Sequence, residues 1–255
     1  MRTLLTGLLL AFMLPALAIG QSFRMETDVY VGNQKEPLCQ TLTLFCDGLV
    51  YDFLTNGEAN EVTVYNMNSQ RVVLLDTKRC VKTVLGHEQL LQHTASMKAL
   101  ASEDNPVFYF AANPKFDVRF ADLSNELTLA SPTITYRAKG VKPENAAAAL
   151  TYQEFADWSA RLNACRPAQL SPFARMELSR ELAERGLVPE EITRTIVTPG
   201  RFGDRKMEVR SRHLTNWIIS TKDRKRIEMV GEQISKFEAV GLKQFLEPEK
   251  VAAQR

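Results

Sequence analysis

The stretch from 39 to 82, CQTLTLFCDGLVYDFLTNGEANEVTVYNMNSQRVVLLDTKRCVK, decides the fold. Turns at Asp47-Gly48, at Asn56-Gly57 and around Asn68-Ser69 divide it into four strands, because such dipeptides suit tight hairpins. The first turn pairs Cys46 with Leu49, Leu44 with Tyr51 and Leu42 with Phe53. The second pairs Tyr51 with Val62 and Leu49 with Val64, and the third pairs Val64 with Val73 and Val62 with Leu75.

All three turns place apolar side chains on one common face. That face collects Leu42, Leu44, Cys46, Leu49, Tyr51, Phe53, Val62, Val64, Val73 and Leu75. A slip of one residue in any strand would break the agreement. The opposite face is mixed and holds Thr41, Thr43, Phe45, Val50, Asp52, Thr63, Tyr65, Val72 and Leu74. We therefore expect the sheet to be covered on both sides, or one face to line a cavity.

The rest of the chain alternates between strand and helix patterns. Residues 23–31 alternate with a period of two and predict a strand that precedes the other four. A helix is predicted over 88–102, strands over 107–111, 116–120, 126–130 and 133–137, and a linker over 139–143. Helices follow, with an N-cap at Ser171, a Schellman stop at Gly186 and a further short helix from Val188. The last two predicted elements are a strand over 207–219 and a helix that begins with a capping box at Ser220.

These elements predict an α+β fold: an antiparallel, strongly twisted, half-barrel-like sheet with helices packed on it. We expect one domain over 21–255. Its parts are a β-meander with one helix (21–138), a helical segment (143–195), and a strand plus C-terminal helix (206–246). The last strand could rejoin the first sheet or stay apart from it.

The N-terminus predicts export. Arg2 precedes an apolar run from Leu4 to Leu14, and small residues then offer cleavage after Ala18 or after Gly20. This order is typical of a secretory signal peptide, here 1–20. We expect a protein that is soluble after cleavage and periplasmic or extracellular.

The cysteine positions favour free thiols over disulfides. Cys39 and Cys46 lie on one predicted strand about 23 Å apart, and Cys39 and Cys80 lie about 14 Å apart in an open meander. A disulfide needs Cα atoms within about 7 Å. A strongly curled sheet could still join Cys39 to Cys80.

Few chemistries fit the sequence. His87 and His93 are six residues apart, which places them on different faces of a helix, and we predict no metal site and two surface histidines. No nucleophile elbow, C-x-x-C or glycine-rich phosphate loop occurs, so no catalytic residue and no cofactor are predicted. The sequence does not decide whether two carboxylates lie close in space as a catalytic pair, because such residues need not be close in sequence. Asp52 is the most interesting acid, because it lies mid-strand on the mixed face. Its alternative role is that of a solvent-facing strand residue.

A basic run near the C-terminus suggests a surface partner. Arg210, Arg212, Arg224 and Lys225 could contact an envelope protein or an anionic membrane surface. A solvated strand face and helix start would explain the same residues. The net charge of only +2, the sparse aromatic residues and the predicted export argue against nucleic acid.

The segments FCDGLVYDF (45–53), NEVTVYNM (60–67) and QRVVLLD (70–76) resemble the β-meander of the lipoprotein-carrier (lipoprotein-sorting) family of the bacterial envelope. The resemblance covers 23–83 and extends in part to 107–138. It implies a half-barrel whose concave face holds acyl chains beneath helices. The chain departs from that family because it begins with a strand instead of an amphipathic helix, and 143–195 has no counterpart there. YQEFADWSARLN (152–163) and PFARMELSRELAERGLVPEE (172–191) resemble a pattern of uncharacterised exported bacterial proteins.

The leading hypothesis is an exported, non-enzymatic binding protein that holds a lipid or another apolar molecule between sheet and helices. The candidate ligand-binding residues are Leu44, Tyr51, Val62, Val73, Phe45 and Tyr65. One alternative is a structural or interaction protein of the envelope with a filled core. A third is a hydrolase with an unrecognised carboxylate site. A cavity beside the sheet would favour the first.

Overall fold

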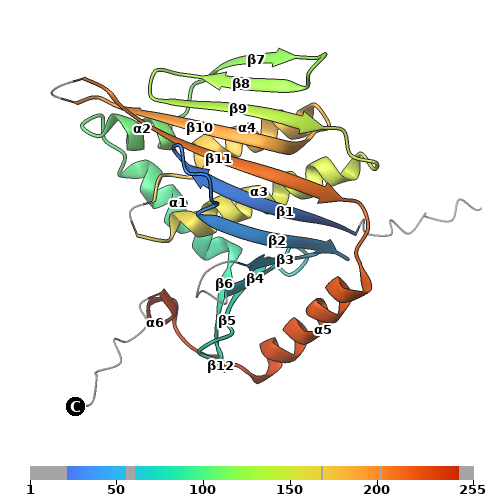
Figure 1. The fold of residues 1–255 in the computed structure, drawn as a ribbon. Helices are drawn as coiled ribbons and strands as arrows, with labels where there is room; N and C mark the ends of the chain where they lie inside the picture. Colours follow the sequence, from blue (N-terminus) through green and yellow to red (C-terminus); the bar gives the residue numbers. More distant parts are fainter. Residues whose placement is uncertain (1–21, 56–60, 168, 201–202, 247–255) are drawn as a thin grey trace, which may run out of the picture.

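The computed structural model describes residues 22–55, 61–167, 169–200 and 203–246. Their twelve strands form one sheet in the order β12-β6-β5-β4-β3-β2-β1-β11-β10-β9-β8-β7 (Figure 1). The strands are β1 (Phe23–Val31), β2 (Cys39–Cys46), β3 (Leu49–Leu54), β4 (Glu61–Asn66), β5 (Arg71–Asp76), β6 (Val81–Gly86), β7 (Asp117–Ala121), β8 (Glu126–Ala130), β9 (Ile134–Val141), β10 (Val188–Thr198), β11 (Arg205–Asn216) and β12 (Glu238–Ala239). The helices are α1 (His87–Ala99), α2 (Pro106–Ala112), α3 (Ala147–Ala164), α4 (Phe173–Glu184), α5 (Thr221–Lys236) and α6 (Leu242–Leu246). The predicted α+β fold, an antiparallel sheet with helices on it, is confirmed; only the short β12 pairs in parallel.

The meander register is confirmed at two of its three turns. Cys46 lies opposite Leu49, with Asp47 and Gly48 both at positive φ as the tight turn requires, and Val64 lies opposite Val73. The register across β3 and β4 was predicted wrongly: Tyr51 pairs with Val64, not with Val62. The connection from Leu54 to Glu61 is longer than a two-residue turn, and Asn56-Gly57 lies outside the described residues. Because the error is two residues, every side chain still keeps its predicted face.

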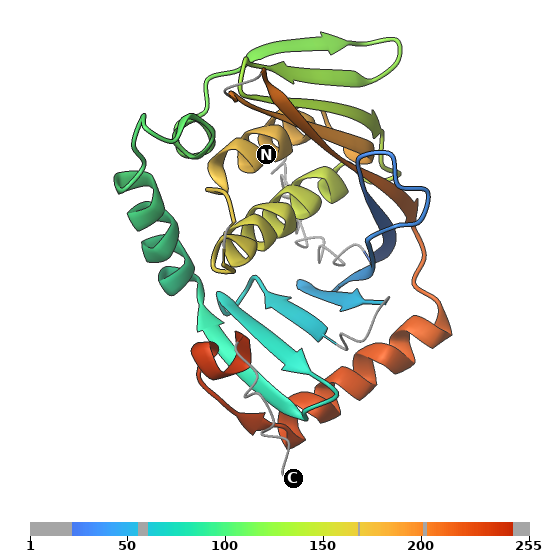
Figure 2. The same ribbon diagram turned by 60° about the vertical axis from the view of Figure 1, so that its left-hand side comes forward.

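Both faces of the meander are covered, by different helices. The apolar outer face packs against Ile227, Val230 and Ile234 of α5 and against Phe237 directly after it, as the spacing of these residues predicts. The mixed inner face packs against α1 and α3. Figure 2 shows the sheet curving around α3 and α4, so that the inner face is concave. The predicted half-barrel-like shape is thus that of an open sheet wrapped around helices.

The last long strand rejoins the sheet. β11 pairs with β1 along its length and with β10 on its other side, so β1, β11 and β10 join the meander to β7–β9. α5 then begins with the predicted capping box: Ser220 Oγ accepts from Asp223 N at 3.1 Å, and Asp223 Oδ2 accepts from Ser220 N at 3.1 Å. This cap directs α5 back across the outer face.

Four local predictions were wrong. Residues 107–111 belong to helix α2, since Pro106 occupies its first turn and the Asn105 side chain caps it by accepting from Phe108 N. The predicted linker 139–143 begins inside β9, and 188–191 is the start of β10 rather than a helix. Ser171 is not the N-cap of α4, because the helix begins two residues later, at Phe173.

The Schellman stop at the end of α4 is confirmed and explains β10. Leu187 N donates to Leu182 O at 3.0 Å, and Gly186 N donates to Ala183 O at 2.9 Å with Gly186 at positive φ. The chain then turns directly into β10 beside Gly140, where a Cβ atom would lie 2.9 Å from the Leu187 Cβ. Gly140 therefore permits this close approach.

The cysteines, the helices and the N-terminal segment were each the subject of a prediction. Cys39, Cys46, Cys80 and Cys165 are all free thiols. Among the described residues, no helix is both long and apolar enough to cross a membrane. The predicted signal peptide, 1–20, lies outside the described residues.

Candidate functional site

A hollow runs between the concave face of the sheet and helices α3 and α4. It consists of two adjoining pockets of about 480 and 390 Å³, within the size range of small-molecule sites. We name them the Asp52 pocket and the Arg194 pocket. The residues that line both are Val29, Ala160, Asn163, Arg166 and Arg175. Ala160 of α3 therefore sits at their junction.

The Asp52 pocket has walls of mixed character. The sheet contributes hydroxyl groups of Thr27, Thr41, Thr43 and Thr63 beside apolar Met25 and Leu54. Helix α3 contributes apolar Phe155 and Leu162 together with Ser159 and Asn163. The pocket therefore suits a molecule with both apolar and polar parts better than a plain hydrocarbon.

Asp52 lies deep in this pocket without a cationic partner of its own. Thr43 Oγ1 donates to Asp52 Oδ1 at 2.8 Å. Burial raises the pKa of Asp52 to about 6, against the hydrogen bonds from Thr43 and Thr41 and with the charge of Glu61 adding to the rise. The carboxyl is surrounded by protein yet keeps some accessible surface, as expected of a group that lines a cavity. It can accept or donate a hydrogen bond to a ligand near neutral pH.

Aromatic rings form the wall above Asp52. Phe155 makes edge-to-face contacts with Tyr65 at 5.3 Å, with Phe45 at 5.4 Å and with Tyr152 at 6.2 Å between ring centroids. Burial raises the pKa of Tyr65 and of Tyr152, so both phenols stay protonated. These contacts hold α3 against the meander and fix the shape of the pocket.

A histidine lies where β1 and β11 pair, at the back of the Asp52 pocket. His213 Nδ1 is 3.0 Å from Thr27 Oγ1, and its Nε2 is 2.9 Å from Ser211 Oγ. The arrangement looks like a serine nucleophile beside a histidine base, with a hydroxyl in place of the usual carboxylate. Burial, followed by the charge of Arg175, lowers the pKa of His213 to about 3. Such an imidazole is a poor general base, because an effective one has a pKa near the working pH.

The Arg194 pocket lies beneath the start of α4. Arg166, Arg175 and Arg194 line it, together with Tyr136, Ser171 and Ser211 and apolar Ile134 and Ile192. Asn163 and Gln169 are exposed at its rim. Arg166 is paired with Glu61, and Arg175 donates to Ser179 Oγ at 2.6 Å and to Tyr152 OH at 3.3 Å. This pocket is more basic than its neighbour.

The structure brings only one of the six predicted ligand-binding residues, Tyr65, to these pockets. Leu44, Tyr51 and Val62 are buried against α5 on the outer face, and Val73 packs at the edge of the same cluster. Phe45 stacks on Phe23 with centroids 4.0 Å apart. The apolar face is thus a filled core, and the cavity lies on the mixed face.

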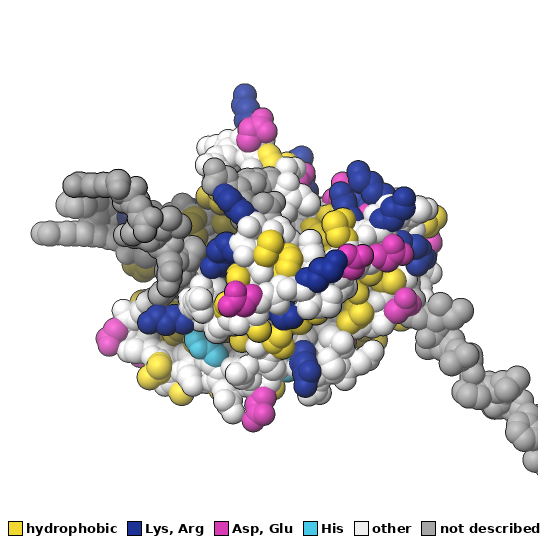
Figure 3. Space-filling view, turned by 90° about the horizontal axis from the view of Figure 1, so that it is seen from below, with side chains coloured by type: hydrophobic (Ala, Val, Ile, Leu, Met, Phe, Trp, Pro, Cys, Tyr) yellow, Lys and Arg dark blue, Asp and Glu magenta, His cyan; other side chains and the backbone are white. Residues whose placement is uncertain are grey.

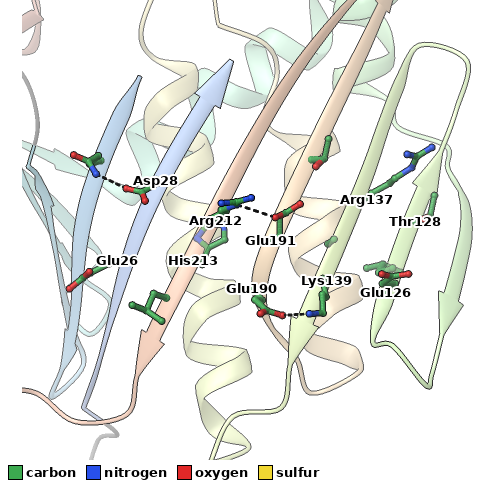
Figure 4. A pocket seen from close by; sticks show the side chains of 15 residues that line it. Glu26, Asp28, Glu126, Thr128, Arg137, Lys139, Glu190, Glu191, Arg212 and His213 are labelled. Atoms are coloured by element: carbon green, nitrogen blue, oxygen red, sulfur yellow. Dashed lines mark hydrogen bonds and ion pairs between the residues drawn. The ribbon is translucent and has the colours of Figure 1, made fainter. Parts of the chain in front are cut away.

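A larger hollow of about 750 Å³ lies on the outer side of the sheet, over β1 and β8–β11 (Figure 4). Among the residues that the structure describes, two ion pairs cross this hollow. Lys139 Nζ is 2.8 Å from Glu190 Oε2, and Arg212 Nε is 3.4 Å from Glu191 Oε2. Asp28 accepts from Gln40 at 2.7 Å. This hollow is lined by acidic and basic side chains side by side, several of them exposed, and we place the candidate site on the inner face instead.

The predicted basic surface divides into two parts. Arg210 and Arg212 of β11 lie over the ring of Tyr30 on β1, at 5.0 and 5.9 Å from its centroid. Arg224 and Lys225 belong to the first turns of α5. Figure 3 shows the side of the molecule that carries α5, where Lys and Arg side chains gather toward one end with Asp and Glu beside them.

The two helical histidines do not form a metal site with their neighbours. His87 is buried and stacks on Trp158 with centroids 3.5 Å apart, which corrects the prediction of a surface histidine. His93 Nε2 is 3.2 Å from Ala164 O. Within the described ranges, no group of three or more His, Cys, Asp or Glu side chains could hold a metal ion.

Comparison with known proteins adds no identification: no protein-family model matches the chain, and none of the curated proteins matches it either.

The sequence pointed to Asp52 only as a candidate acid, not as a ligand-binding residue, and it gave no prediction for the basic end of the site. Asp52 stood out as a carboxylate in the middle of a half-apolar strand face. Arg175 and Arg194 gave a weaker signal. Arg175 follows Pro172 in a helix start where acidic residues are more usual, and Arg194 interrupts an apolar alternation between Ile192 and Ile196. Recognising that alternation would have required reading 188–198 as a strand.

Proposed function

We propose that this protein is an exported, non-enzymatic binding protein that holds an amphipathic small molecule between the concave face of its sheet and helices α3 and α4. The observation that carries the proposal is the pair of adjoining pockets with mixed walls. A buried carboxyl that lacks a cationic partner costs stability, and groups of this kind are concentrated at functional sites. The likeness to lipoprotein carriers agrees with this proposal, because their ligand also lies under helices on a concave sheet.

The experiment blocks the junction of the two pockets. Ala160→Phe would fill the space between Val29 and Arg175. The control is Leu150→Phe, at a 63% exposed position of the same helix. Binding is followed by the fluorescence of N-phenyl-1-naphthylamine, a neutral apolar probe, and by its displacement with dodecanol and dodecanoate.

We expect the wild type and Leu150→Phe to bind the probe and release it on addition of either dodecyl compound. Ala160→Phe should lose at least about tenfold in affinity, since a filled pocket excludes the ligand. Equal binding by all three proteins would place the probe elsewhere and would refute this site.

A second candidate function, acid–base catalysis, is favoured by one observation, the pKa of about 6 at Asp52 with Glu61 nearby. A hydrolase would cleave a chromogenic ester or glycoside, and Asp52→Asn would abolish that activity while leaving probe binding intact. Binding without turnover of any such substrate would support the first function.

The basic surface belongs to the same proposal as a contact with the envelope. Arg210, Arg212, Arg224 and Lys225 would bring the protein to an anionic membrane surface or an envelope protein, where an amphipathic ligand could be received or released.

A further inference from the structure

The described side chains that line the Arg194 pocket include three arginines and no acid. Arg166 is compensated by Glu61, but Arg175 donates to two neutral oxygens, those of Ser179 and Tyr152. Asp157 lines a different hollow, where burial raises its pKa and the charge of Arg175 opposes that rise, so Asp157 offsets part of the charge of Arg175 from outside the pocket. A cationic wall in a concave site attracts an anion.

Two hydrogen-bonding groups of the same pocket are buried without a partner. Arg194 Nε and Ser171 Oγ have no hydrogen-bond partner among the described residues. An unsatisfied buried donor costs about 1–3 kcal/mol, and more where the group is charged. Such groups are rare in proteins and call for a partner that the chain itself does not supply.

The start of α4 adds further positive potential to the Arg194 pocket. Pro172 and Ala174 line the pocket beside Arg175, so the N-terminal end of this twelve-residue helix faces it. Its first turn contains no acidic residue. The partial positive charge of a helix N-terminus stabilises anions close to it.

The positive charges of the pocket act to lower the pKa values of neighbouring titratable groups, as positive charges are expected to do. The charge of Arg175 acts with burial to lower the pKa of His213, and the charges of Arg194 and Arg175 oppose the effect of burial on the Tyr136 phenol. Both groups belong to strands that line the pockets.

We propose that the Arg194 pocket is an anion site, in which Arg175, Arg194 and Ser171 hold the carboxylate or phosphate head of an amphipathic ligand. The apolar part of that ligand passes Val29 and Ala160 into the Asp52 pocket. The inference rests on the proposed function and adds the chemical class of the head group. Guanidinium groups suit this role because they donate two parallel hydrogen bonds to a carboxylate or phosphate.

The experiment compares three ligands that share one chain, namely dodecanoate, dodecyl phosphate and dodecanol, by displacement of N-phenyl-1-naphthylamine. The wild type should bind at least one of the two anions roughly tenfold or more tightly than dodecanol. The stronger of the two anions distinguishes a fatty-acid head from a phospholipid-type head. This comparison needs no variant, so it does not depend on the folding of a mutant.

Arg194→Gln should reduce anion binding roughly tenfold and leave dodecanol unchanged. The matched control is Arg137→Gln, which removes the same charge from the outer face of the neighbouring strand β9. Arg194→Lys should restore part of the preference, since it keeps the charge but loses the planar donor pair.

The outcomes separate the two claims. Equal affinity for dodecanol and both anions, unaltered by Arg194→Gln, would overturn the anion site and leave the binding function standing. Failure of all three ligands to displace the probe from the wild type would overturn the binding function itself.

Discussion

Replacing Asp52 by Asn should stabilise the protein at neutral pH. The carboxyl has a pKa of about 6 in the folded chain and an ordinary value of 3.8. Burial disfavours its charged form, and Glu61 adds to the effect. The difference corresponds to at most about 3 kcal/mol, at roughly 1.4 kcal/mol per pKa unit. Asn keeps the shape and can still accept from Thr43, so it removes the charge with little other change.

The pH dependence has a definite sign. A carboxyl whose pKa is raised on folding contributes stability that is complete below the unfolded value, near pH 4, and is lost as the pH rises through about 6. Asp52→Asn should therefore gain up to about 3 kcal/mol at pH 7.5 and only about 0.5 kcal/mol at pH 4. Glu61 and Arg166 face Asp52 across the same pocket and are unchanged in the variant.

Urea denaturation followed by tryptophan fluorescence at both pH values gives the free energy of unfolding. The control is Asp47→Asn, an exposed acid in the first hairpin whose positive φ Asn also tolerates. The control should change stability by less than about 0.5 kcal/mol at either pH. If Asp52→Asn destabilises the protein at pH 7.5, or if its gain in stability does not depend on pH, then the carboxyl is not buried without a compensating positive charge, as the structure describes it.

Three other changes test separate parts of the structure. Gly140→Ala should lower stability by roughly 1–3 kcal/mol in thermal unfolding, because the new Cβ would meet Leu187 at 2.9 Å, and an unchanged melting temperature would contradict the close contact. Leu178→Ala should cost about 2–5 kcal/mol, as this side chain of α4 is fully buried against the sheet, and a smaller loss would contradict close packing at this position. The double change Arg224→Glu and Lys225→Glu should reduce cosedimentation with phosphatidylglycerol vesicles, and equal binding would remove these residues from the proposed membrane contact.

The sheet could be predicted because its signals are local. Asp47-Gly48 specifies a turn type, and alternation around it assigns faces, so the pairing of β2 with β3 followed from the sequence. The pairing of β3 with β4 depended on the length of a loop, which alternation does not constrain beyond its parity. For this reason Tyr51 was placed two residues out of register and still on the correct face.

The wrong elements were those whose local pattern fits both structures. Val107 to Ala111 is a short apolar run, which periodicity alone cannot assign to helix or strand. Val188-Pro189-Glu190-Glu191 looks like a helix start, but pairing of Val188 with Val141 places it in the sheet. The Asn105 cap and Pro106 decided the first case, and pairing in the sheet decided the second.

The candidate site was only half predictable for a similar reason. Asp52 reveals itself because a carboxylate within a half-apolar strand is unusual at any place in a fold. Arg175 and Arg194 come from a helix and a strand about twenty residues apart, and only the wrapping of the sheet around α4 brings them to one pocket. The six predicted binding residues followed the most apolar face, which α5 covers as ordinary core.

The most direct test of the binding function is native mass spectrometry of the full chain, purified without denaturation from the cells that express it. The wild type and Leu150→Phe should carry a bound small molecule that dissociates on activation, and Ala160→Phe should carry none. A wild type without any bound molecule, or an equal load on Ala160→Phe, would contradict a ligand between the sheet and α3.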